Sequence, residues 1–295
     1  MTAGREILQP LMDAEEHGFG PHRRSSVIQW LKSTASVTRY TMNKLFRFVG
    51  LVAVGTCLLW PTPARPAEPP AGARGKIRVL IVTGGHDFNA EGFFAVFNNN
   101  PDITYRVVQH PKAHALLKPD AAKQYDVLLA YDNYQDISEE AKADFVGLIH
   151  GGKGLLVVHH GIGSYLDWPE FWKIMGARWY HVKTVVDGVE KFSFPSDSEN
   201  VHFRVHVVNP RHAVTRGMQD YDMIDETYQA FDVYPDSKPL LTTDSPLSNK
   251  VIAWEKTYGE GRVVCIQSGH GPDAYVNPNY QQFLRQAIRW TARRD

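Results

Sequence analysis

Short apolar runs bounded by glycine and polar residues alternate along the chain with segments of helical periodicity. Residues 77–83 (IRVLIVT) are apolar and β-branched and end in Gly84 and Gly85, which is typical of a buried parallel strand that enters a loop. The same pattern predicts further strands and helices. The strands are expected over 103–108, 125–131 and 154–159, and the helices over 91–98 and 138–150. Strands that alternate with helices favour a parallel sheet covered by helices on both faces.

The second half of the chain is less regular. Apolar and polar residues alternate over 200–208 (NVHFRVHVV), which predicts a half-exposed, antiparallel strand. Further strands are expected over 251–254 and 262–267, and a final helix over 278–293 would cover the sheet. About 220 residues from residue 76 onward fit one domain. We therefore expect a single α/β domain over 76–295, with a mainly parallel sheet in a three-layer arrangement.

The residues before this domain have the pattern of an export signal. Residues 42–67 run from a basic start through an apolar stretch to a proline- and alanine-rich end, the order of a cleavable secretory signal peptide. The apolar stretch is shorter than the roughly 20 residues that a membrane-spanning helix needs. We expect a periplasmic or secreted protein without stable membrane insertion after cleavage, a dispensable upstream extension over 1–41 and a flexible linker over 68–75. A membrane anchor, or a lipoprotein modified at Cys57, is the alternative.

Charge and cysteine content narrow the possible partners. The chain has 32 basic and 32 acidic residues, and residues 1–67 hold eight of the basic and four of the acidic ones. The remainder is mildly acidic, which argues against a nucleic-acid partner. Cys57 lies in the predicted signal, so the mature chain has Cys265 alone and no internal disulfide. Its stability must come from a hydrophobic core.

Histidines follow three of the predicted strands. His86 follows the first strand, His159 and His160 follow the fourth, and His270 follows the strand over 262–267. In open parallel sheets ligands bind beyond the carboxyl ends of the strands, so we expect His86, His160 and His270 to converge there. Neighbouring residues of a strand point in opposite directions, so we expect His160 to face the ligand and His159 to pack inward. Hydrogen bonding to loop carbonyls is the alternative role for each histidine.

Neutral imidazoles can hold a divalent ion such as zinc, or they can move protons. Glu226, in the run DETY after a short apolar stretch, would add a carboxylate to the same edge. The expected catalytic residues are thus His86, His160, Glu226 and His270, and the three histidines are the expected metal ligands.

Aromatic residues gather near the loop after the fourth strand. Aromatic rings stack on the apolar face of a sugar while polar groups bind its hydroxyls. Core packing is the alternative, and it is favoured for Phe171 and Trp172. The residues expected to bind substrate are Asp87, Tyr165, Trp168, Trp179 and Tyr228.

The chain lacks the residues that several classes of reaction need. The turn HHGIG has the spacing of a nucleophile loop, but Gly161 occupies the nucleophile position and Cys265 lies inside a predicted strand. Covalent acyl chemistry therefore has no candidate atom. The loop at Gly84 and Gly85 lacks the third glycine of a dinucleotide fingerprint, and no phosphate-binding Gly-Lys-Ser/Thr loop is present. We expect neither NAD nor ATP as a cofactor.

Four motifs in order resemble the ThuA-like (trehalose-utilisation) family. They are GGHD at 84–87, HHGIGSY at 159–165 with WPEF at 168–171, DETY at 225–228 and GHG at 269–271. The resemblance covers residues 76–293 and implies the flavodoxin-like fold of class I glutamine amidotransferases without their catalytic cysteine. It also implies a role in the catabolism of trehalose, or of keto-sugars made by partner dehydrogenases.

Together, the residues and the resemblance predict an exported enzyme of carbohydrate catabolism. Its substrate would be a sugar or keto-sugar of the trehalose or 3-keto-glycoside type, and its reaction that of a hydrolase, lyase or isomerase. A divalent metal ion would assist if it is bound. Fold alone does not give function, so a non-catalytic carbohydrate-binding module is the alternative. The oligomeric state is left open by the sequence.

Overall fold

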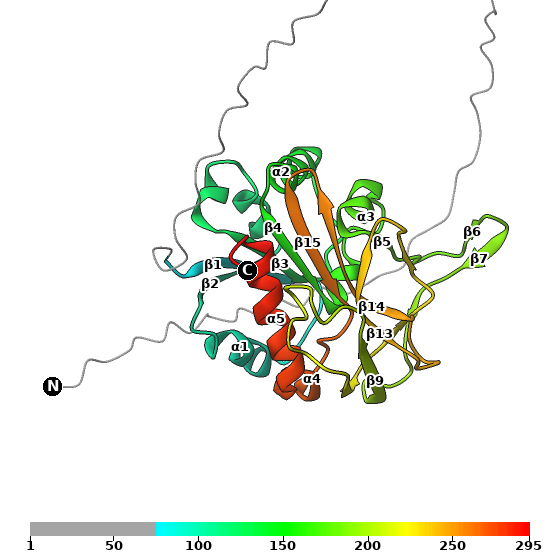
Figure 1. Ribbon diagram of the computed structural model, residues 1–295. Helices are drawn as coiled ribbons and strands as arrows, with labels where there is room; N and C mark the ends of the chain where they lie inside the picture. The colour runs from blue at the N-terminus through cyan, green and yellow to red at the C-terminus, as the bar shows by residue number, and fades with distance from the viewer. Residues whose placement is uncertain (1–74) are drawn as a thin grey trace, which may run out of the picture. The chain divides into compact units, whose positions relative to one another are not determined.

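A computed structural model describes residues 75–295 and places a nine-stranded mixed sheet at the centre of the domain (Figure 1). The predicted extension and signal peptide, and the predicted linker up to residue 74, lie outside the described residues. The strand order is β10-β9-β13-β14-β15-β4-β3-β1-β2. The parallel neighbours are β2 (Ile103–Gln109), β1 (Ile77–Gly84), β3 (Val127–Asp132), β4 (Gly154–Val158) and β15 (Gly261–Ile266). Antiparallel pairing continues the sheet through β14 (Val251–Tyr258), β13 (Lys238–Thr243), β9 (Val201–Val207) and β10 (Tyr221–Asp225).

The parallel strands bring their carboxyl ends to one edge. In the register between β1 and β3, Gly84 lies opposite Asp132, and in the register between β15 and β4, Ile266 lies opposite Val158. Each strand therefore delivers the loop that follows it to the same side of the sheet. β3 and β4 are buried along their whole length, which explains their continuous apolar sequences.

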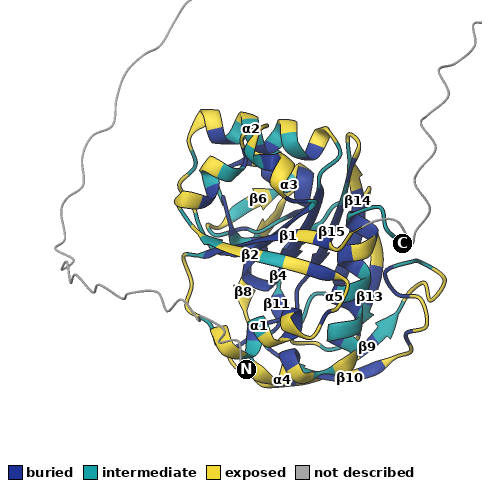
Figure 2. Cartoon of the chain, turned by 90° about the vertical axis from the view of Figure 1, so that its left-hand side faces the viewer, coloured by how far each residue is buried: buried dark blue, intermediate teal, exposed yellow. Residues whose placement is uncertain are grey.

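Helices cover both faces of the sheet and form two hydrophobic cores. On one face pack α1 (Ala90–Asn98), α4 (Pro272–Val276) and α5 (Pro278–Thr291), which bury Phe93, Tyr275 and Phe283. On the other face pack α2 (Glu139–His150) and α3 (Pro169–Met175), which bury Phe145 and Phe171. Figure 2 shows the central strands buried and the outward sides of the helices exposed. The expected single-domain, three-layer α/β fold is confirmed.

Local sequence signals explain where the helices begin. The Ser138 side chain accepts a hydrogen bond from the backbone N–H of Ala141 at the start of α2. At the start of α5, Asn277 accepts from two backbone N–H groups and Pro278 occupies the first helical position. Phe283, Ala287, Ile288 and Trp290 of this last helix are buried, so it covers the sheet as expected.

Short elements that the sequence pattern does not predict complete the domain. They are three two-stranded sheets and three 3-10 helices: β11 (Tyr228–Gln229) with β8 (Phe194–Pro195), β12 (Asp232–Val233) with β5 (Ala177–Arg178), β6 (Thr184–Val186) with β7 (Val189–Lys191), η2 (Lys112–Leu116), η3 (Ala121–Gln124) and η4 (His159–Gly163). Strands of two or three residues are too short to show a period in the sequence. Among residues 75–295, no helix is both long and apolar enough to cross a bilayer.

Candidate functional site

The histidines that follow β1, β4 and β15 meet at one edge of the sheet. The ring of His86 stacks on that of His160 with 4.4 Å between centroids, and it lies edge-on to the ring of His270 at 6.3 Å. The ring centroid of His159 lies 5.1 Å from those of both His160 and His270. The structure thus brings together the three histidines that the sequence indicates, and it adds His159.

Two of these histidines and Glu226 point their donor atoms at one another. The Oε2 atom of Glu226 lies 3.3 Å from Nε2 of His159 and 3.3 Å from Nδ1 of His270, and those two nitrogens are 3.0 Å apart. One donor atom from each residue lies within 4.8 Å of the others. We call His159, Glu226 and His270 the triad.

The triad has the donor set of a divalent metal site. The Nδ1 atom of His159 lies 2.7 Å from the carbonyl oxygen of Gln267, which can only accept a hydrogen bond. Nδ1 therefore carries the proton, and in the neutral ring the lone pair is on Nε2, the atom that faces the triad. Two imidazoles and one carboxylate are a common ligand set for catalytic zinc and for other first-row divalent ions.

The donor atoms that converge differ from the metal ligands expected from the sequence. The donor atoms that converge belong to His159, Glu226 and His270, whereas His86 and His160 lie beside them. The reason is the backbone at the end of β4. His159 begins η4 with a φ of +51°, so the alternating directions of an extended strand stop at Val158. His159 therefore turns toward the same edge as His160.

His160 is buried and neither of its ring nitrogens has a hydrogen-bond partner. Burial, followed by the neighbouring imidazoles of His159, His86 and His270, lowers the pKa of His160 to about 2. The ring therefore stays neutral at physiological pH. Next to it, a Cβ atom on Gly161 would lie 2.7 Å from the carbonyl oxygen of Ala130, so the turn has no room for a nucleophilic side chain.

The carboxylates of the site have opposite pKa shifts. Burial by itself raises the pKa of Glu226, but the neighbouring imidazoles of His159 and His270 outweigh it and lower the pKa to about 2. The hydrogen bond to Glu226 in turn raises the pKa of His270. Asp225 accepts hydrogen bonds from the backbone N–H groups of Gly269 (2.6 Å) and His270 (3.0 Å), and burial raises its pKa to about 6. Asp225 thus fixes the backbone that carries His270.

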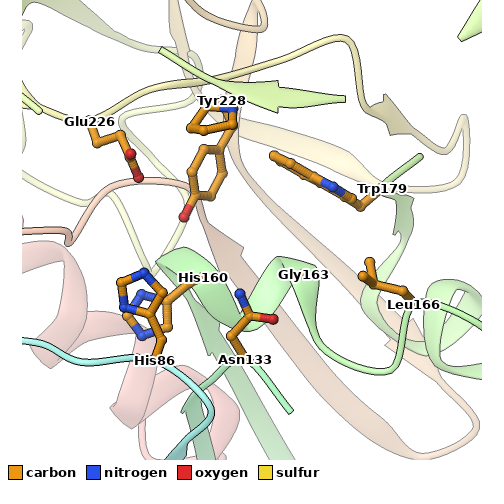
Figure 3. Close-up of a pocket in the computed structure, with 9 residues that line it drawn as sticks. His86, Asn133, His160, Gly163, Leu166, Trp179, Glu226 and Tyr228 are labelled. Atoms are coloured by element: carbon orange, nitrogen blue, oxygen red, sulfur yellow. The ribbon is translucent and has the colours of Figure 1, made fainter. Parts of the chain in front are cut away.

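A cavity of about 200 Å³ opens beside the triad. Figure 3 shows the Glu226 carboxylate and the Tyr228 hydroxyl pointing toward the stacked pair of His86 and His160, with Trp179 beside Tyr228. The Trp179 and Tyr228 rings are 5.0 Å apart and edge-to-face. We call this cavity the histidine pocket. It is lined by His86, Asn133, His160, Gly163, Leu166, Trp179, Pro195, Glu226 and Tyr228.

Three residues expected to bind substrate lie elsewhere. Trp168 is buried against Phe145 and Phe171, so it belongs to the core. It directly precedes α3, which buries Phe171, Ile174 and Met175. Tyr165 is also buried, outside the pocket. Asp87 lines a separate cavity together with His270. Of the five expected residues, Trp179 and Tyr228 line the histidine pocket.

A second buried polar cluster lies outside the pocket. The Nε2 atom of His110 lies 2.7 Å from Oδ2 of Asp132, and both side chains are almost fully buried. The Tyr165 hydroxyl approaches Nε2 of both His110 (3.3 Å) and His114 (3.2 Å). The neighbouring backbone is hydrogen-bonded to the end of β1, where His110 N–H donates to the Thr83 carbonyl and Asn133 N–H to the Gly84 carbonyl. The cluster therefore supports the loops that carry His86 and Asn133.

Sequence reasoning missed this cluster, although a signal was present. His110 follows the strand expected over 103–108, so the rule that selected His86 also applies to it. Asp132 ends β3 within an apolar run, and nothing in its sequence context marks it as buried beside a histidine.

Comparisons with known proteins agree with the fold. The chain is similar to a ThuA-like protein from Parabacteroides merdae, with a TM-score of 0.61 and 16% identity over 74% of this chain and 90% of that one. A ThuA-like protein from Bacteroides uniformis gives a TM-score of 0.56 and 19% identity over 78% and 95% of the two chains. A search of curated proteins gave no match. The family model described as ThuA, trehalose utilisation, matches residues 78–291. This chain therefore belongs to the ThuA family.

Proposed function

We propose that this chain is an exported enzyme of carbohydrate catabolism that acts on a sugar or keto-sugar of the trehalose or 3-keto-glycoside type. One observation carries the proposal. His160 is buried with both ring nitrogens unpartnered, and it lines a pocket that also contains the rings of Trp179 and Tyr228. Buried polar groups are normally hydrogen-bonded, so an unpartnered imidazole in a pocket indicates a polar ligand. The family description, trehalose utilisation, agrees with a sugar.

The lining of the pocket suits a sugar ring. Trp179 and Tyr228 offer aromatic surface for the apolar side of the ring. The Asn133 amide and the Glu226 carboxylate offer hydrogen bonds to its hydroxyls. A few polar groups among apolar walls are the usual composition of a small-molecule site.

The histidines beside the triad can move a proton. The Nδ1 atom of His86 lies 2.5 Å from the carbonyl oxygen of Asp87, so Nδ1 donates and Nε2 of the neutral ring is free to accept. We assign His86 to accept a proton from a ring hydroxyl, or from a ring carbon beside a carbonyl, and His160 to hydrogen-bond the reacting oxygen. The triad would hold a divalent ion, which when bound polarises a carbonyl or paired hydroxyls.

Turnover of a sugar panel by matched variants tests the proposal. The panel contains trehalose, simple glycosides and their 3-keto derivatives, and the proteins are wild type, His160→Ala and Trp179→Ala. We expect His160→Ala to lower kcat by roughly an order of magnitude or more, because it removes a group at the reacting atoms. Trp179→Ala should mainly raise KM.

The same panel tests the alternative, a non-catalytic binding module. In that case Trp179→Ala would abolish sugar binding, His160→Ala would leave it intact, and no protein would turn over any sugar. Turnover that survives unchanged in His160→Ala would contradict the assigned role of this histidine.

The export part of the proposal rests on residues 42–67, whose order of basic, apolar and small residues matches a cleavable signal. N-terminal sequencing of the protein produced in a bacterium with a periplasm tests it. We expect a mature chain that begins near residue 65 or 68. A cytoplasmic product that retains residues 1–41 would contradict export.

A further inference from the structure

The loop after β15 is hydrogen-bonded at all four polar backbone groups of Gly269 and His270. Both N–H groups donate to the Asp225 carboxylate, at 2.6 and 3.0 Å. The carbonyl oxygen of Gly269 accepts from the Tyr131 hydroxyl (2.7 Å), and that of His270 accepts from the Tyr275 hydroxyl (2.8 Å). Three side chains therefore fix the backbone that carries one histidine of the triad.

These three side chains come from separate elements of the fold and are all buried. Asp225 ends β10, Tyr131 lies in β3 and Tyr275 lies in α4. The two tyrosine hydroxyls lie 2.8 Å apart. A buried polar group that loses its hydrogen bond costs free energy, so the loop cannot shift without a penalty at several buried groups.

A third tyrosine touches the same loop without bonding to it. Gly269 has a φ of +128°, and a Cβ atom at this position would clash with the Tyr280 hydroxyl. That hydroxyl is buried, and it has no hydrogen-bond partner among the described residues. Tyr280 therefore offers a matched control, because removing its hydroxyl changes the same surroundings but breaks no hydrogen bond to the loop.

The fixed loop determines where the His270 ring points. Its Nδ1 atom lies 3.3 Å from Oε2 of Glu226 and 3.0 Å from Nε2 of His159. Metal–nitrogen bonds tolerate little variation in length, so a ligand must be held within a fraction of an ångström of its place. A ring that is already in place also loses less conformational freedom when an ion binds.

We propose that Asp225, Tyr131 and Tyr275 are positioning residues that hold His270 in the orientation needed to bind a divalent ion at the triad. This inference rests on the proposed function for the ion itself. Tyr131 also contacts the histidine pocket, because its ring centroid lies 4.3 Å from that of His160. One buried side chain thus orients a triad histidine and packs against the histidine assigned to the reacting oxygen.

Zinc titration of the metal-free protein by calorimetry tests the proposal with Tyr131→Phe, Tyr275→Phe and Tyr280→Phe. Each variant loses one hydroxyl and keeps its ring. We expect the first two to bind zinc about 10-fold or more weakly, the scale for losing a group that orients a metal ligand. Tyr280→Phe should bind zinc like the wild type. Urea denaturation separates the two kinds of role, because a purely structural hydroxyl would change the stability and not the zinc affinity of the folded protein.

A second measurement needs no ion. The rings of His159 and His270 are 5.1 Å apart between centroids, so a nuclear Overhauser effect should join their carbon-bound protons in the metal-free wild type. We expect this effect to weaken in Tyr131→Phe and Tyr275→Phe and to persist in Tyr280→Phe.

The two measurements distinguish a failure of this inference from a failure of the proposed function. A wild type that binds no zinc, with the ring contact changing as expected, would remove the ion from the proposed function and leave the positioning role standing. Zinc affinities in Tyr131→Phe and Tyr275→Phe equal to that of Tyr280→Phe would overturn the proposal. So would a ring contact that is unchanged in all three variants.

Discussion

The Nδ1 atom of His159 lies 2.7 Å from the carbonyl oxygen of Gln267, at the junction between β15 and the loop that carries His270. This contact fixes the proton on Nδ1 and leaves Nε2 to face Glu226 and His270. A histidine held in this way by a backbone carbonyl has the arrangement of a metal ligand, because the second nitrogen keeps both its lone pair and its direction.

We predict that the chain binds one divalent ion at the triad. Zinc binding by the metal-free protein, followed by calorimetry and elemental analysis, should give one ion per chain in the wild type. His159→Ala and Glu226→Gln should each weaken binding about 10-fold or more, because each removes a donor atom. His160→Ala should keep the ion. The reverse pattern, in which His160→Ala loses zinc and His159→Ala keeps it, would instead support the ligand set first expected from the sequence.

Cys265 should be chemically inert in the folded protein. Its side chain is fully buried, its Sγ lies 3.4 Å from the carbonyl oxygen of Met175, and burial raises the pKa of its thiol. A thiol reagent should therefore label it only in denaturant, in a chain where Cys57 is replaced by serine. We also expect Cys265→Ser to retain the turnover of the wild type. Rapid labelling of the native protein that substrate prevents would contradict this expectation.

The buried pair of His110 and Asp132 should be necessary for stability. Their side chains are only 2% and 3% exposed. Asp132→Ala would leave the imidazole buried without its partner, so we expect a loss of about 3–5 kcal/mol in the free energy of unfolding, measured in urea. Replacing both residues with leucine should cost less than the sum of the two single leucine variants. A loss of less than about 1 kcal/mol in Asp132→Ala would show that the pair has no such role.

The ion pair between Arg78 and Asp126 makes a pH-dependent contribution to the free energy of unfolding. Burial raises the pKa of Asp126, but side-chain and backbone hydrogen bonds from Arg78 outweigh it, so the net pKa is lowered. A lowered carboxyl pKa stabilises the fold above the pKa of the unfolded chain, and that stabilisation is lost as the pH falls through the folded value. Arg78→Met should thus cost about 0.5–1 kcal/mol at neutral pH, a small value because the pair is partly exposed.

Urea denaturation of wild type and Arg78→Met across the acidic range measures this difference. The difference in the free energy of unfolding between wild type and Arg78→Met should be constant above about pH 5 and shrink below about pH 4. Lys118→Met, which breaks the exposed pair with Glu140, is the control and should change little. A gap for Arg78→Met that grows as the pH falls would contradict the assignment.

Most of the fold could be predicted because the central strands are buried on both faces. Continuous apolar runs such as β1 and β4 can be recognised without knowledge of their neighbours. The alternation over β9 likewise gave the correct antiparallel strand, which pairs with β10 and β13. The two-residue strands that wall the pocket could not be found this way. β8 and β11 depend on contacts between segments more than 30 residues apart, with Tyr228 opposite Pro195.

The site was predictable to the level of loops but not of individual side chains. The rule that ligands bind beyond parallel strands correctly selected the loops that carry His86, His160 and His270. The choice between His159 and His160 depended on one backbone angle, the φ of +51° at His159, which no periodicity reveals. Similarly, Trp168 and Trp179 both lie near the loop after β4 in the sequence. Only the packing against Phe171 shows that Trp168 belongs to the core.

Nitrogen NMR of the histidine rings is the sharpest measurement of whether a sugar occupies the histidine pocket against His160. With histidine labelled at both ring nitrogens, the signals of His160 and His110 are recorded while trehalose or a 3-keto-glycoside is added. His160 lines the pocket and its two ring nitrogens are unpartnered, whereas His110 does not line the pocket and is paired with Asp132. We therefore expect a saturable shift for His160 and none for His110. Sugar binding that leaves the His160 signals unchanged, or the absence of any shift with every sugar of the panel, would rule out a sugar site against His160.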